Sequence, residues 1–398
     1  MEASPSYDTV LQIMERVKDV VTLFRCAMAC KGWRRLIMAD PSFIRRCLPE
    51  EVCRLAPFPG FFAQLRPRRG SPTPCLIPAP RPVLGSYRRP LRSFIPNLAD
   101  PGFFDHGVPL VSRHGLLLVR LADVDPHPTS DDLLAVCNLL TGTLDVLPRL
   151  KHDRAVHGHH MTGYAILTDG DYSSSDDKQG HPLPSFKVLV VGISQSTLRY
   201  RLRTFSSAGE PRWNTCFGIV DGGRIDSPFM QHNAVVCGGM ARWLFQGKSS
   251  YRSGDVFFTK LSVTHDQLMN GLKYEESYFS ADTEGRLRMI YLQKQGRQLN
   301  ILTWEHNRGF ADARVLMLEQ PYQQKKEIGV VYTCLGENSG TLLMKDNHRR
   351  VYVADIKTGV MHEVAGNWPR TCNLRRSKTV PLGTDWPTLF LSRLGVAT

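Results

Sequence analysis

The sequence predicts a short N-terminal module of three α-helices followed by an all-β, β-propeller-like domain of short antiparallel strands. Residues 10–37 have helical periodicity, a proline-rich segment follows them, and the rest alternates between short apolar runs and turn residues. We expect the helical module to span residues 8–47 and a Pro/Arg-rich connection to span residues 48–100, where the first strands can already begin. The β-domain is expected at residues 101–398.

Apolar residues in the N-terminal segment recur at the i, i+3, i+4, i+7 spacing that lines one face of a helix. They are Val10, Ile13, Met14 and Val17 in the first helix, Val20, Leu23, Phe24 and Ala27 in the second, and Trp33, Leu36 and Ile37 in the third. The third helix is expected to end at Asp40-Pro41, because proline lacks the N–H that a helix needs. Three helices this short bury little surface, so we expect something else to cover their apolar faces.

Runs rich in Val, Leu, Ile, Tyr and Phe predict many short strands in the rest of the chain. The predicted strands are 115–120, 133–139, 187–193, 198–205, 234–237, 243–246, 256–262, 287–293, 299–304, 329–335, 341–345, 350–355 and 360–364. Gly, Asn, Asp and Ser between them predict hairpin turns. A β-propeller protects the edges of so many strands over about 300 residues, and a double sandwich is the alternative.

A degenerate repeat supports the propeller interpretation. A strand, a turn that carries Thr-Gly and a further strand can be read at 134–148 and again at 351–364. The absence of a Trp-Asp dipeptide argues against WD40 repeats. Between residues 49 and 101 the prolines exclude helix over most of the segment. Part of it can be a flexible linker, but Phe58, Phe61 and Phe62, and then Phe94-Ile95-Pro96, are apolar enough to form short strands of the next domain.

Composition indicates an ordinary soluble globular protein. The 398 residues are 42% hydrophobic and 22% charged, and we expect neither a transmembrane segment nor a signal peptide. Ten irregularly spaced cysteines suggest free thiols and a cytosolic or nuclear location. The net charge of +13 is spread along the chain without a nucleic-acid motif, so nucleic-acid binding stays a minor alternative.

Four patterns suggest chemistry, and each has a simpler explanation. Gly247-Lys248-Ser249 lacks the first glycine of a phosphate-binding loop. His152, His157, His159 and His160 lack the second ligand pair of a zinc site. Cys26 and Cys30 are expected to pack as small apolar residues, and the acids of 169–177 are interpreted as a solvated loop. We therefore expect no catalytic residues, no metal and no cofactor.

The N-terminal segment resembles an F-box, the adaptor-docking module of SCF-type ubiquitin ligases. The residues that carry the resemblance are Ile13-Met14, Arg16-Val17, Leu23, Arg25, Cys30-Lys31, the run 33–37 and the tail 40–43. Segments of the β-domain resemble the F-box-associated β-propeller-like region of grass F-box proteins. These segments are 115–118, 135–138, 234–239, 340–343, 385–387 and 393–395.

The resemblance implies a non-enzymatic substrate receptor with a Skp-type adaptor, a cullin scaffold reached through that adaptor, and an unknown protein target as partners. By resemblance, the adaptor-binding residues are Val10, Ile13, Met14, Val17, Leu23, Phe24 and Trp33. One alternative is a scaffold that binds no adaptor, because Pro5-Ser6 and Lys18 replace the family's Leu-Pro and proline. The others are an enzymatic propeller, such as a hydrolase, and an RNA-binding protein.

Overall fold

The computed structural model describes the helices, the strands and many of their connections. The described residues are 7–17, 20–39, 60–65, 71–78, 88–121, 131–151, 162–168, 171, 185–193, 199–219, 234–237, 239–245, 251–253, 256–260, 277–281, 287–295, 298–305, 314–318, 332–335, 341–345, 351–356, 358–363 and 379–382. Within them the chain forms three α-helices, one short 3-10 helix and 24 β-strands. The protein is therefore mostly β-structure, as the sequence predicted.

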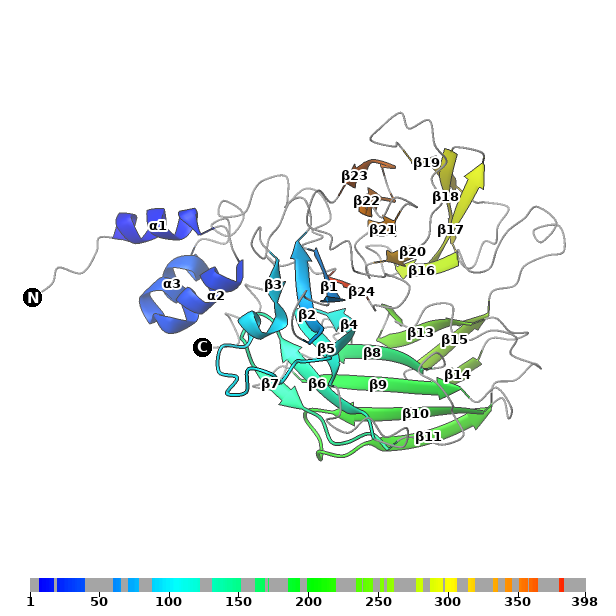
Figure 1. The fold of residues 1–398 in the computed structure, drawn as a ribbon, viewed down its shortest axis with the longest axis horizontal. Coiled ribbons are helices and arrows are strands. Elements are labelled where there is room, and N and C mark those ends of the chain that lie inside the picture. The colour runs from blue at the N-terminus through cyan, green and yellow to red at the C-terminus, as the bar shows by residue number, and fades with distance from the viewer. Residues whose placement is uncertain are drawn as a thin grey trace, which may run out of the picture.

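The helices come first in the chain and are α1 (Tyr7–Arg16), α2 (Val20–Ala29) and α3 (Lys31–Ala39), drawn in blue in Figure 1. Helices α2 and α3 pack against each other. Helix α1 joins the hydrophobic core through Met14, and Val17 directly after it packs partly against the same core. This arrangement does not establish a compact three-helix module, which stays a prediction. None of the helices in the described segments has the length and apolar character needed to cross a membrane.

The described strands form six sheets of four strands each. The first three have the strand orders β24-β1-β2-β3, β4-β5-β6-β7 and β8-β9-β10-β11. Their strands are β1 (Gly60–Leu65), β2 (Thr73–Pro78), β3 (Arg89–Pro90), β4 (Val108–Arg113), β5 (Leu116–Leu121), β6 (Leu133–Asn138), β7 (Leu144–Val146), β8 (Thr162–Thr168), β9 (Phe186–Ile193), β10 (Arg199–Ser206), β11 (Asn214–Ile219) and β24 (Thr379–Pro381).

The other three sheets have the strand orders β12-β13-β15-β14, β16-β17-β18-β19 and β20-β21-β22-β23. Their strands are β12 (Val235–Cys237), β13 (Met240–Phe245), β14 (Tyr251–Ser253), β15 (Val256–Lys260), β16 (Ser277–Ala281), β17 (Leu287–Gln295), β18 (Gln298–Glu305), β19 (Arg314–Met317), β20 (Tyr332–Leu335), β21 (Thr341–Lys345), β22 (Val351–Asp355) and β23 (Met361–Glu363). Every sheet except the first is built from consecutive strands.

The first strand of each sheet contacts the first strands of its two neighbours, and these contacts close into a ring. The sequence of contacts runs β4, β8, β12, β16, β20, β24 and back to β4. Because β24 pairs with β1 through Phe61–Pro381, Phe62–Val380 and Ala63–Thr379, the C-terminal strand completes the sheet that the N-terminal strands begin. This is the arrangement of a six-bladed propeller-like domain.

Clusters of buried apolar side chains lie between neighbouring sheets. One joins β4–β6 to β8–β10, for example through Leu118 and Val188. Another joins β17–β18 to β21–β22, and a third joins β1–β2 to β21–β22 through Phe61 and Leu343. Sheets that share such a cluster cover each other's faces, and in β5 one set of alternating residues lies in the cluster with β8–β10 and the other in the cluster with the helices, so both sets are apolar.

The Thr-Gly repeat predicted from the sequence forms the same turn in two sheets, between β6 and β7 and between β22 and β23. In the first turn the Asn138 side chain accepts from the Thr141 amide at 3.1 Å, and in the second Asp355 accepts from the Thr358 amide at 3.2 Å. Gly142 and Gly359 then adopt φ of 79°, which glycine reaches without a steric cost. The repeat therefore marks equivalent positions in the second and sixth sheets.

Two sequence expectations were wrong. Phe94 lies in the 3-10 helix η1 (Leu91–Phe94) rather than in a strand, because Pro90 fixes an extended backbone just before it and cannot propagate strand hydrogen bonds. The strands are also not all antiparallel, since β13 pairs with β15 in parallel. Strands β14 and β15 form a tight hairpin in which Ser253 opposes Val256, and this places β14 at the outside of its sheet.

Candidate partner-binding surface of the helices

The structure describes six of the seven side chains that we expected to bind an adaptor, and they differ in how far they are buried. Met14, Leu23 and Phe24 are buried. Val17 and Trp33 are partly buried against the same cluster. Ile13 is 52% exposed, and the side chain of Val10 lies outside the described residues.

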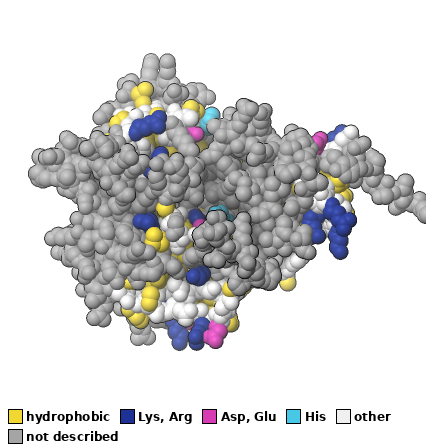
Figure 2. Space-filling view, turned by 180° about the vertical axis from the view of Figure 1, so that it is seen from behind, with side chains coloured by type: hydrophobic (Ala, Val, Ile, Leu, Met, Phe, Trp, Pro, Cys, Tyr) yellow, Lys and Arg dark blue, Asp and Glu magenta, His cyan; other side chains and the backbone are white. Residues whose placement is uncertain are grey.

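Among the helix side chains that the structure describes, two large apolar ones are exposed, namely Ile13 of α1 and Met28 of α2, which is 46% exposed. Met28 was not predicted from the sequence. Its signal was present, because it falls outside the stripe of Leu23, Phe24 and Ala27 that the spacing assigns to the core. Figure 2 shows apolar and basic side chains together at the helical end of the molecule, and the exposed basic residues there are Arg16, Lys31 and Arg35.

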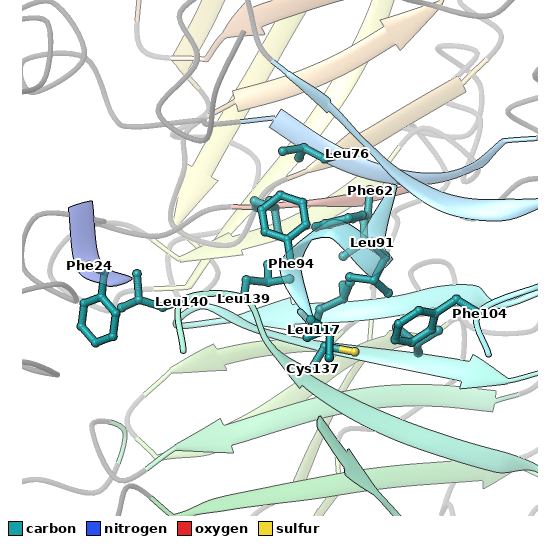
Figure 3. Close-up of a cluster of buried hydrophobic side chains, with 14 of the residues drawn as sticks. Phe24, Phe62, Leu76, Leu91, Phe94, Phe104, Leu117, Cys137, Leu139 and Leu140 are labelled. Carbon is teal, nitrogen blue, oxygen red and sulfur yellow. The ribbon is translucent and has the colours of Figure 1, made fainter. Parts of the chain in front are cut away.

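The buried helical residues pack against the chain's own β-domain. Phe24 and Leu23 belong to one hydrophobic cluster with Leu140, Phe62 and Phe94. In Figure 3 the ring of Phe24 lies beside Leu140, at the end of the helix that faces the sheet. Leu140 is part of the turn between β6 and β7, so the docking site for α2 is the turn that the Thr-Gly repeat builds.

A polar contact holds the same junction. Arg25 donates from Nη2 to the carbonyl oxygen of Phe94 at 2.6 Å, which satisfies an acceptor at the end of η1. Gly142 lies next to this hydrogen bond. A Cβ atom at position 142 would come within 3.2 Å of Arg25 Nη2 and 2.8 Å of Pro96 Cδ. Arg25 belongs to the residues that resemble an F-box, yet in this structure its guanidinium binds within the chain.

A second cluster of polar side chains joins the second and third sheets. Arg113, at the end of β4, forms a buried ion pair with Asp171, and their side chains are 6% and 4% exposed. Asp171 also accepts from the amide and the hydroxyl of Thr168, at 2.7 Å and 3.1 Å. Since that hydroxyl donates to Asp171, its 2.7 Å contact with Nδ1 of His114 requires the imidazole to donate.

This cluster corrects the interpretation of the acids at 169–177 as a solvated loop. The interpretation is wrong for Asp171, because a sequence pattern cannot reveal that Arg113 lies opposite it across a boundary between two sheets. Asp169, Asp176 and Asp177 lie outside the described residues.

The environment of Asp171 suits a structural role better than proton transfer. Burial by itself would raise the pKa of Asp171, but hydrogen bonds from Arg113, its positive charge and the amide of Thr168 together lower the pKa below its usual value. A carboxylate that is ionised and accepts from Arg113 and Thr168 on both oxygens has little capacity left to act as a general acid or base.

The other chemical candidates lie mostly outside the described residues. This applies to Gly247-Lys248-Ser249 and to His152, His157, His159 and His160. Among the residues that the structure does describe, no group of three or more His, Cys, Asp or Glu side chains could hold a metal ion. Cys26 and Cys30 are partly buried, and Cys26 packs against the core as expected.

Comparisons with known proteins leave the family of the chain open. No family model and no curated protein matches it. Among solved structures it is similar to the α-L-arabinofuranosidase Arb93A from Fusarium graminearum, with 9% identity, a TM-score of 0.31, and 65% of this chain and 79% of that chain covered. It is also similar to the WD40 domain of SCAP from fission yeast, with 9% identity, a TM-score of 0.22, and 62% and 39% covered.

A third similar structure is a prolyl endopeptidase, with 10% identity, a TM-score of 0.30, and 95% of this chain and 56% of that chain covered. Similarity at this level carries no conclusion about activity or partners.

Proposed function

We propose that the chain is the substrate-recognition subunit of an SCF-type E3 ubiquitin ligase, with the helices binding a Skp-type adaptor and the β-domain binding a protein target. The observation that carries the proposal is the F-box-like residue pattern at 13–43. Its helices keep Ile13 and Met28 exposed, while the other described residues of the apolar stripes are buried or partly buried. In this role the protein supplies proximity, and partner subunits supply the ubiquitin-transfer chemistry.

The exposed surface has the composition of a protein interface. Apolar side chains that stay in water gain free energy when a partner covers them. Arg16, Lys31 and Arg35 of the same helices are exposed, and basic residues at the rim of an interface accelerate association with an acidic partner. We therefore place adaptor binding on the helices, at the exposed residues Ile13 and Met28.

A second candidate function is a protein-binding scaffold that needs no adaptor. The burial of Leu23 and Phe24 against Leu140 favours it, because two of the residues expected to contact an adaptor already have partners within the chain. The two functions differ in one measurable respect, which is whether the intact chain binds a Skp-type adaptor.

Co-purification of the full chain with a plant Skp-type adaptor at micromolar concentration tests the proposal. We expect Ile13→Asp and Met28→Asp each to weaken capture by at least about tenfold, because a charge placed in an apolar interface must lose its water. Val315→Asp is the matched control, since Val315 is equally exposed but lies on the outer strand β19. Its capture should equal that of the unmodified chain.

Each outcome decides between the two functions. No capture of the adaptor by the unmodified chain contradicts the ligase proposal and favours the scaffold. Full capture by both helix variants contradicts the assignment of the surface. Leu23→Asp is unsuitable as the main variant, because a charge at this buried position also disrupts packing against the β-domain.

A further inference from the structure

The outer edge of the third sheet has the features of a docking site for an extended peptide. Strand β11 is the last strand in the order β11-β10-β9-β8, so among the described strands it has a hydrogen-bonded neighbour on one side only. Its central residues Thr215, Cys216 and Phe217 are all exposed. Phe217 is 62% exposed, which is unusual for a phenylalanine in a strand.

Basic side chains flank this edge on one face of the sheet. Arg201 and Arg203 of β10 lie opposite Phe217 and Thr215 of β11. The guanidinium of Arg201 stacks over the ring of Phe217, at 4.7 Å from its centroid. Alternation directs the intervening Leu202 to the opposite face, where it is buried.

The charge of the edge is strongly one-sided. The segment 199–219 contains four arginines and one acidic residue, Glu210. Glu210 pairs with Arg212 at 3.0 Å in a solvent-exposed ion pair within the turn before β11, so it does not oppose Arg201 and Arg203 on the strand. Figure 2 shows dark-blue side chains beside a magenta one at the lower margin of the molecule, with yellow side chains above them, on the side on which Figure 1 places β9 to β11.

A comparable outer strand is already covered. Strand β19 also exposes apolar side chains, Val315 and Met317, but its backbone lies against the β22–β23 turn. A Cβ atom at Gly359 would come within 2.6 Å of the Met317 carbonyl oxygen. The β11 edge therefore has an exposed aromatic ring and arginines beside an outer strand. At β19 the β22–β23 turn occupies the place that an added strand would need.

We infer that β11 captures an extended acidic peptide segment as a fifth strand of its sheet, with Arg201 and Arg203 binding its carboxylates and Phe217 packing against its apolar side chains. An added strand forms backbone hydrogen bonds whatever its sequence, and its side chains at alternate positions provide the selectivity. Charge complementarity selects the occupant, because the face beside the edge presents guanidinium groups. The inference rests on the proposed function and names the class of target that the β-domain recognises.

Binding of a defined probe tests the inference. The probe is a fluorescent ten-residue peptide whose odd-numbered positions are alternately Glu and Val and whose even-numbered positions are Thr, so that Glu and Val lie on the same face of the added strand. Binding is measured by anisotropy at low salt with the full chain. We expect saturable binding that weakens as salt screens the charges. A peptide with Lys in place of Glu should not bind. Two N-methylated probes are compared, one methylated at its odd-numbered residues and one at its even-numbered residues. One of them should lose binding and the other should keep it, because successive N–H groups of a strand point to opposite edges.

Variants locate the binding site. Arg203→Glu and Phe217→Ala should each weaken binding at least about fivefold, and Phe217→Ala retains the fold because the ring is largely exposed. Arg314→Glu is the matched charge reversal, because Arg314 is exposed but lies on the covered outer strand β19, and this variant should bind the probe as the unmodified chain does. The probe should also slow alkylation of the exposed Cys216, measured by mass spectrometry of the peptide that contains it.

Several results would overturn the inference. The first two are binding of the Lys peptide as tight as that of the probe, and equal loss of binding by the two N-methylated probes. The third is unchanged binding of the probe by Arg203→Glu and Phe217→Ala. The fourth is displacement of the probe by single-stranded polyuridine at a lower concentration than by unlabelled peptide. Adaptor capture is measured on the same variants and should be unchanged. Loss of probe binding with adaptor capture retained contradicts the inference alone, whereas loss of adaptor capture by the unmodified chain contradicts the proposed function.

Discussion

Asp171 shows how one charged residue can hold two sheets together. Its carboxylate and the Arg113 guanidinium are both buried, so neither charge has water to replace its partner. Ion pairs in such positions contribute little net stability as a pair, but removal of one member leaves the other charge buried and unsatisfied. At the residue scale the fold therefore depends on both members being present.

We predict that Asp171→Asn destabilises the protein by about 3–5 kcal/mol at pH 7, measured by chemical denaturation. Because the pKa of Asp171 is lowered in the fold, the ionised carboxylate stabilises the protein above its unfolded pKa of about 4. This contribution is lost as the pH falls through the lower folded pKa. The difference between the two proteins should therefore shrink below about pH 4. Glu210→Gln, in the exposed pair with Arg212, should give no difference at any pH.

At the scale of elements, the sequence predicted strands best where an apolar run ended in a recognisable turn. Strands β6 and β22 have both signals, and the sequence predicts their Thr-Gly turns. Strand β24 has neither, because its three residues Thr-Val-Pro carry no periodicity and its partner β1 lies more than 300 residues earlier in the chain. Pairing across that distance depends on the closing of the ring and leaves no local pattern.

Strand β24 is nevertheless the element that closes the ring. Val380 is buried in the hydrophobic cluster that also contains residues of the helices, and Ser112 of β4 donates to the Pro381 carbonyl at 2.7 Å. We predict that Val380→Asp lowers the midpoint of thermal unfolding far more than Val146→Asp does. Val146 is an exposed residue of the outer strand β7, so its aspartate stays in water. Equal shifts in the two midpoints would show that ring closure is not needed for stability.

At the scale of the whole molecule, the helices and the β-domain share one core. The sequence predicted which helical residues are apolar, and Leu23, Phe24, Ala27 and Ile37 are indeed buried. It could not predict what buries them, because an amphipathic stripe packs equally well on any apolar surface of suitable shape. The same limit applies to Ile13. The sequence places Ile13 and Met14 on the same apolar face of the first helix, but Met14 is buried and the Ile13 side chain is exposed.

The shared core implies that the helices gain their stability from the β-domain, and Arg25 offers a test. Arg25→Ala removes the guanidinium that donates to Phe94 at 2.6 Å, and a hydrogen bond from a charged donor contributes about 1.5–3 kcal/mol. We predict that amide hydrogen exchange in α2 then accelerates by at least about tenfold, whereas exchange in β9 and β10 stays unchanged. Arg212→Ala is the control, because Arg212 lies in an exposed ion pair. If exchange in α2 did not change, the helices would be stable without this contact, and the orientation of any bound adaptor relative to the β-domain would depend on the apolar packing of Phe24 and Leu140 alone.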